Sequence, residues 1–151
     1  MKKSGILLLL MLPFYWAFAQ NLQPYILGFE TTETIARISE SMQNNLKENG
    51  IKVIGQYQPA GDKNRFLIVF TSPELEKAVQ SAGGLTGFAA TLRIGITIEN
   101  GKTLISYTNP LYWGNAYFRD NFDKVSPYYS ALAKHLETAM RASGSFTGKP
   151  F

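Results

Sequence analysis

An Asn100-Gly101 pair stands between two segments, residues 91–99 and 102–108, in which apolar and polar residues alternate. Two-residue hairpin turns need a positive φ at both central positions, which Asn and Gly tolerate best, so the pattern predicts an antiparallel β-hairpin. This hairpin constrains the fold more than any other feature, because it favours an antiparallel sheet over a doubly wound parallel one.

A strand followed by a capped helix is predicted at the start of the domain. Residues 24–30 form a short apolar and aromatic run, typical of a strand. Thr31 or Thr32 would cap the next helix, with Glu33 in its first turn. The helix should end at Asn49-Gly50 and carry an apolar stripe formed by Ile35, Ile38, Met42 and Leu46.

A strand pair and a second helix come next. Residues 51–57 alternate as a strand does, and residues 65–71 are almost all apolar, which predicts a central strand buried on both faces. Ser72 and Pro73 are typical of an N-cap and a first helical position, so a helix should begin there and stop at Gly83-Gly84.

The last third of the chain is predicted to hold one long helix. Asn109-Pro110 should end the sheet, and the aromatic-rich residues 111–122 then serve as a connector. The helix would open at Ser126-Pro127 and end at residues 143–144, followed by a loose tail. The predicted class is therefore α+β, with an antiparallel sheet of about five strands, helices on one face, and the order β-α-β-β-α-β-β-α.

Residues 1–19 are expected to be a secretory signal peptide. Lys2 and Lys3 precede an apolar run, and Ala17-Phe18-Ala19 fits signal peptidase cleavage before Gln20. The remaining residues, 20–151, would form a single exported domain, periplasmic or secreted, without a stable membrane anchor. Loss of the two lysines lowers the formal net charge from +4 to +2, and no Lys/Arg cluster suggests nucleic acid as a partner.

Several of these segments resemble the domain of unknown function 302 family. The resemblance covers residues 24–110 and rests on the opening strand and helix, on FLIVFTSPELEKAVQ, and on the hairpin RIGITIENGKTLISYTNP. It implies a compact α+β fold and no established activity. Many members carry a Pro-Cys pair before the hairpin, whereas this chain reads Phe88-Ala89-Ala90-Thr91, so a role for that cysteine is not expected here.

The sequence offers little support for catalysis or for a cofactor. His135 is the only histidine and there is no cysteine, so no metal site of ordinary ligand spacing is predicted. No Gly-x-Ser-x-Gly elbow is present, and the Gly83-Gly84-Leu85-Thr86-Gly87 run lacks the Lys-Ser/Thr ending of a phosphate loop. These absences favour a binding role over an enzymatic one.

An aromatic-rich stretch at residues 107–129 is the one sequence feature that stands out as a candidate functional site. Tyr and Trp combine an apolar body with a polar tip, which suits pocket walls and interfaces, although such residues also fill ordinary cores. The first hypothesis is a pocket for a small apolar or aromatic ligand. The alternative is a homodimer or protein-binding surface in the cell envelope. The candidate residues for either role are Tyr107, Tyr112, Trp113, Tyr117, Phe118 and Arg119.

Overall fold

The computed structural model describes residues 22–151, so the signal peptide expected at residues 1–19 lies outside the described residues. Its centre is a six-stranded sheet in the order β2-β3-β4-β5-β1-β6, with antiparallel pairing between all neighbours. The strands are β1 (Tyr25–Thr31), β2 (Lys52–Tyr57), β3 (Arg65–Thr71), β4 (Leu92–Glu99), β5 (Lys102–Thr108) and β6 (Lys149–Pro150). The predicted α+β antiparallel class is confirmed.

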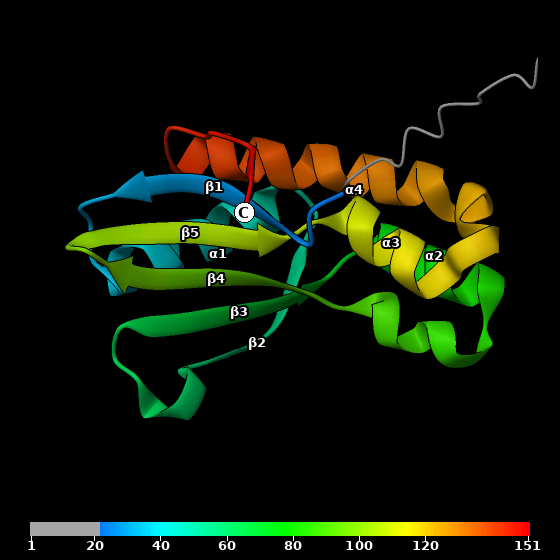
Figure 1. Cartoon of the computed structure of the whole chain (residues 1–151), viewed down its shortest axis with the longest axis horizontal. Helices are drawn as coiled ribbons and strands as arrows, with labels where there is room; N and C mark the ends of the chain where they lie inside the picture. Colours follow the sequence, from blue (N-terminus) through cyan, green and yellow to red (C-terminus); the bar gives the residue numbers. More distant parts are fainter. Residues whose placement is uncertain (1–21) are drawn as a thin grey trace, which may run out of the picture.

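Four α-helices accompany this sheet in the described part of the chain: α1 (Ile35–Glu48), α2 (Pro73–Ala82), α3 (Pro110–Phe118) and α4 (Phe122–Ser143). Helices α1 and α4 pack along one face of the sheet, while α2 and α3 gather beyond its end (Figure 1). Short 3₁₀ segments η1 (Pro59–Gly61), η2 (Gly84–Ala90) and η3 (Arg119–Asn121) complete the connections. The long α4 therefore joins the sheet to the helical end of the molecule.

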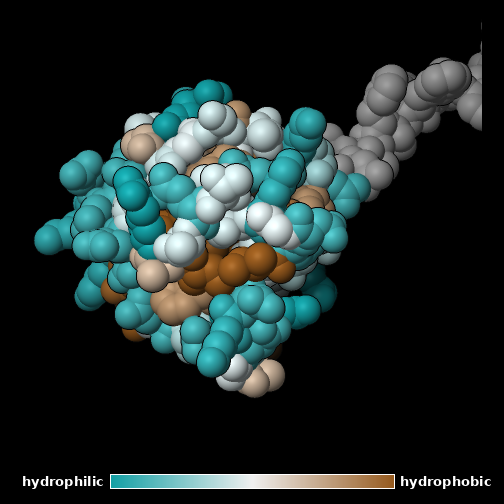
Figure 2. All heavy atoms as spheres, turned by 90° about the vertical axis from the view of Figure 1, so that its left-hand side faces the viewer, coloured by the Kyte–Doolittle hydropathy of each residue, from teal (hydrophilic) through white to brown (hydrophobic). Residues whose placement is uncertain are grey.

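The core lies between the sheet and these helices. Most helix-facing residues of the central strands are buried, as are the inner residues of α1 and α4; the fully buried ones include Ile68, Phe70, Ile94, Ile96, Ile105, Met42, Leu46, Leu132 and Leu136. The predicted α1 stripe is confirmed at three of its four positions, and Ile35 is partly exposed. At the end of the molecule that carries the β4–β5 turn, the surface is mostly hydrophilic around one apolar strip (Figure 2).

Two local predictions about β3 and α1 need correction. β3 is buried on one face only: Ile68 and Phe70 face the helices, while Leu67 and Val69 stay partly exposed on the other face, since no helix covers it. The cap of α1 is Thr34, whose Oγ1 accepts a hydrogen bond from the Arg37 N–H at 3.4 Å. The residue Glu33 thus precedes the helix.

The predicted aromatic connector is a helix. Asn109 caps α3 by accepting a hydrogen bond from the Leu111 N–H at 3.1 Å, and Pro110 takes the first helical position. Helix α4 begins at Phe122 and so includes Pro127 in its interior. Pro127 has no N–H to donate to the carbonyl of Asp123 one turn earlier. Ser126 Oγ donates a hydrogen bond to that carbonyl instead, at 3.1 Å.

The tail predicted to be loose is paired to the sheet edge. Pro150 and Lys149 of β6 pair with Ile26 and Leu27 of β1. The Phe151 N–H also donates to the Tyr25 carbonyl at 2.9 Å. These long-range contacts close the β1 edge of the sheet, and β2 remains the outermost strand on the opposite side.

Candidate functional site

The helical end of the molecule contains a groove between η2 and the corner where α3 meets α4, named here the η2 groove. Its volume is about 680 Å³. Its wall residues come from the end of α2, from η2, and from the α3–η3 turn; they are Ala82, Leu85, Thr86, Phe88, Ala116, Tyr117, Phe118, Arg119, Asp120 and Asn121. Three of the six candidates from the sequence, Tyr117, Phe118 and Arg119, meet in this groove.

The two largest apolar side chains of η2 lie open to solvent. Leu85 is 83% exposed and Phe88 is 73% exposed, and both line the η2 groove. The sequence predicts a helix stop and connector at residues 83–87, and neither Leu85 nor Phe88 is among the candidate residues it indicates. The available signal was a pair of large apolar residues in a glycine-rich stretch, where a simple linker would carry polar ones.

Tyr117 joins the groove to a short aromatic stack. Its ring stacks on Trp113, one turn earlier in α3, with centroids 5.4 Å apart and planes at 20°. Tyr112 meets Trp113 edge-on at 6.4 Å and is partly exposed outside the groove. The Trp113 Nε1 atom is buried and has no hydrogen-bond partner among residues 22–151. Trp113 therefore packs against the groove residue Tyr117, and Tyr112 packs in turn against Trp113; neither lines the groove itself.

Phe118 and Tyr107 belong to the core. Phe118 is buried and meets Tyr129 edge-on at 5.7 Å, so it forms the groove floor and helps hold α3 on α4. Tyr107 lies on the helix-facing side of β5 and is buried. Its burial, followed by the nearby charge of Glu137, raises the pKa of Tyr107 to about 12. Tyr107 is not brought to the η2 groove.

Arg119 and Asp120 place opposite charges on the rim. Arg119 ends α3, and its φ of 47° turns the chain sharply toward α4. Its side chain is exposed. Asp120 follows in η3 and is also exposed. An apolar wall with a few polar groups at one edge is the arrangement found in small-molecule sites.

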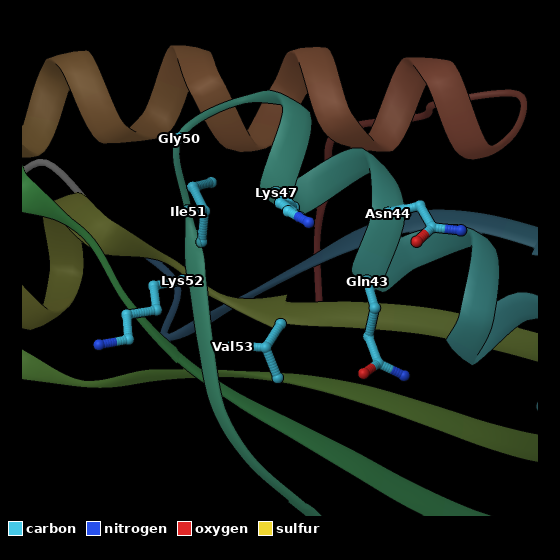
Figure 3. Close-up of a pocket in the computed structure, with 7 residues that line it drawn as sticks. All are labelled: Gln43, Asn44, Lys47, Gly50, Ile51, Lys52 and Val53. Carbon is cyan, nitrogen blue, oxygen red and sulfur yellow. The ribbon is translucent and has the colours of Figure 1, made fainter.

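A second groove of about 520 Å³ lies between the end of α1 and β2. Gln43 and Val53 face one another across it, while Lys52 points away from α1 (Figure 3). Its walls contain amide and lysine side chains and no aromatic residue. The groove is consequently less suited than the η2 groove to an apolar or aromatic ligand.

Few side chains among the described residues are arranged for acid-base catalysis or for binding a metal ion. His135 on α4 lies with Nδ1 3.5 Å from Oε1 of Glu74 on α2, and neither residue lines the η2 groove. Across residues 22–151, no group of three or more His, Cys, Asp or Glu side chains could hold a metal ion. Within the same residues, no helix is long and apolar enough to cross a bilayer.

The fold defines the class of protein: an α+β domain with an antiparallel sheet and helices on one face. It is similar to the crystal structure of an uncharacterized conserved protein, DUF302, from Bacillus stearothermophilus, with a TM-score of 0.64. The similarity covers 80% of this chain and 98% of that one at 16% sequence identity. It supports the resemblance inferred from the sequence and shows the fold alone. No protein-family model and no curated protein matches the chain.

Proposed function

We propose that this protein is a non-enzymatic binding domain that holds a small apolar or aromatic molecule in the η2 groove. The observation that carries the proposal is the exposure of Leu85 and Phe88, 83% and 73%, on the wall of a groove. Burying a large apolar side chain stabilises by about 1.5–3 kcal/mol, so a ligand covering both would gain substantial affinity. The leader sequence supports a place for this domain in the periplasm or outside the cell.

The remaining candidates have distinct roles in this proposal. Tyr117 offers a ring face to the ligand, and Trp113 holds that ring in place by stacking behind it. Arg119 at the rim would orient a polar substituent of the ligand. No nucleophile, metal or bound cofactor is required, because the groove binds without changing a covalent bond.

The direct test uses a neutral fluorescent aromatic, N-phenyl-1-naphthylamine, with the chain from Gln20 to Phe151. This chain contains one tryptophan, Trp113, which should transfer energy to a probe bound beyond Tyr117. Saturable transfer is expected, and the double variant Leu85→Ser/Phe88→Ser should weaken binding by about tenfold or more. Both side chains are exposed, so the fold should survive the change.

Ile54→Ser on β2 is the matched control. Ile54 is also an exposed apolar residue, and it lies outside the groove. Equal losses in the control and the double variant, or no saturable transfer in the wild type, would refute the proposal. Native mass spectrometry of protein purified from its own host supplies an independent check, since a retained small-molecule mass on the monomer would identify the ligand class.

The alternative function is self-association or capture of a protein partner through the aromatic region of residues 107–129. The same exposed Leu85 and Phe88 favour it, and β2 leaves an unpaired strand edge that carries exposed Ile54 and Tyr57. A dimer that the Leu85→Ser/Phe88→Ser variant converts to a monomer, without any retained ligand, would establish this alternative in place of ligand binding.

A further inference from the structure

The face of the sheet away from the helices has an unusual surface. An antiparallel sheet with one solvated face normally carries polar residues there. This face presents Leu67 and the half-exposed rings of Tyr25 and Tyr57, which are 47% and 48% exposed. Pairing places Gly95 of β4 between Leu67 of β3 and Ser106 of β5, with Tyr57 beside Leu67. The two tyrosines come from strands on opposite sides of this centre.

These residues enclose a hollow of about 330 Å³, named here the sheet-face hollow. Pockets for small molecules begin at about 300 Å³. Gly95 and Ser106 lie at its floor, where the strands carry almost no side-chain bulk. A β carbon on Gly95 would lie 3.3 Å from Ser106 Oγ and 3.8 Å from Leu67 Cδ2, so the glycine leaves room for a flat group close to the backbone.

Arg93 gives the sheet-face hollow its charge. It is the one charged residue among those that line the hollow, and it is exposed. Among residues 22–151 no carboxylate lies within ion-pairing distance of its side chain. Thr108 Oγ1 accepts a hydrogen bond from the Arg93 N–H and donates one to the Arg93 carbonyl, both at 3.3 Å. These hydrogen bonds fix the backbone that carries the guanidinium.

We propose that the sheet-face hollow binds a small planar aromatic monocarboxylate, with Arg93 pairing to the carboxylate and the ring lying over Gly95 between Tyr25 and Tyr57. A guanidinium presents parallel N–H donors that match the two oxygens of a carboxylate. One unpaired cation in the lining favours one negative charge on the ligand. The aromatic walls favour a ring, because offset and edge-on ring pairs add to the burial of apolar area.

This site is independent of the η2 groove, because the two share no lining residue. The test titrates the chain from Gln20 to Phe151 with 2-naphthoate and, separately, with the uncharged 2-naphthalenemethanol, by calorimetry. The carboxylate is expected to bind at least about tenfold more tightly than the alcohol. Arg93→Gln should remove that advantage and leave binding of the alcohol unchanged.

Arg65→Gln is the matched control for Arg93→Gln. Arg65 lies on the same face of the sheet but pairs with Asp62 at 3.2 Å and does not line the hollow. Its variant should bind 2-naphthoate as the wild type does. Gly95→Val should weaken both probes by filling the floor, and Gly95→Ala is the milder variant if the valine protein unfolds.

Two results would overturn the proposal. One is the absence of saturable 2-naphthoate binding up to about 1 mM. The other is binding that Arg93→Gln and the Gly95 variants leave unchanged. Because the two sites share no lining residue, the variants separate them: Leu85→Ser/Phe88→Ser should leave the preference for 2-naphthoate over the alcohol unchanged, and Arg93→Gln should leave the effect of the double variant on N-phenyl-1-naphthylamine binding unchanged.

Discussion

Gly114 on α3 lies so close to Tyr129 on α4 that a β carbon on the glycine would stand 3.0 Å from the Tyr129 Cγ atom. The ring of Phe122 approaches the same point even more closely. Tyr129 is buried, and its hydroxyl donates to the Ala89 carbonyl at 3.4 Å. One glycine therefore allows α3, α4 and the end of η2 to pack together, and this packing forms the floor of the η2 groove.

Gly114→Ala is expected to destabilise the protein even though alanine is the better helix former. Overpacking of a close helix contact costs about 1–3 kcal/mol, more than the gain of about 1 kcal/mol from helix propensity. Urea unfolding followed by circular dichroism would measure the change. Gly87→Ala is the control, since a β carbon there meets nothing within 4 Å and its φ is not positive. Equal stability of the two variants would contradict the packing argument.

Much of the fold follows from local signals in the sequence. Asn100 and Gly101 adopt φ values of 51° and 78°, as their hairpin turn requires, and β4 and β5 pair as predicted. Ser72 and Pro73 begin α2 as predicted. These signals are readable because each depends on the backbone preference of one or two residues.

Structure that depends on distant contacts was not predictable in the same way. Helix α3 contains Gly114 and four aromatic residues, which are modest helix formers, and its packing against α4 decides its conformation. Similarly, β6 consists of two residues that become a strand only by pairing with β1. The sequence placed Tyr117, Phe118 and Arg119 in a candidate site, but Leu85 and Phe88 join them only through tertiary folding.

The buried cap of α2 should matter more than the exposed cap of α1. Ser72 is 1% exposed and its Oγ accepts a hydrogen bond from the Leu75 N–H at 3.3 Å, whereas Thr34 makes an exposed bond at 3.4 Å. Ser72→Ala is expected to lower the free energy of unfolding by about 1–2 kcal/mol, and Thr34→Ala by about 0.5–1 kcal/mol. Thermal and urea unfolding of both variants would show which one loses more free energy of unfolding. A larger loss in Thr34→Ala than in Ser72→Ala would contradict the prediction.

Pro127 is expected to make α4 less stable than it would be with a residue other than proline at this position. It stands inside the helix, where it cannot donate to the Asp123 carbonyl and its ring crowds that turn. Pro127→Ala restores the donor, so the free energy of unfolding should rise by about 1–3 kcal/mol. Ser126 Oγ now bonds the same carbonyl, and Ser126→Ala should cost less in the Pro127→Ala background than in the wild type. A less stable Pro127→Ala protein would show that the proline fits its helix without strain.

Two buried tyrosines predict a loss of stability in alkali. Burial raises the pKa of Tyr107 from 10.0 to about 12, with a further contribution from Glu137, and burial raises the pKa of Tyr129 as well, assisted by Tyr117. Between about pH 10 and pH 12 the unfolded chain releases these protons while the folded protein keeps them. The unfolded state then binds fewer protons, so the free energy of unfolding falls as pH rises, by up to about 1.4 kcal/mol per pH unit for each tyrosine.

Tyr107→Phe separates this linkage from general alkaline damage. Phenylalanine has no proton to lose, so the variant should lose stability less steeply than the wild type above about pH 10. The free energy of unfolding of the variant, relative to that of the wild type, should therefore rise with pH, whichever of the two proteins is more stable at pH 8. Urea unfolding at intervals from about pH 8 to pH 11 would measure the two slopes. Parallel curves would mean that Tyr107 titrates alike in the folded and unfolded chains, contrary to its buried position on the helix-facing side of β5.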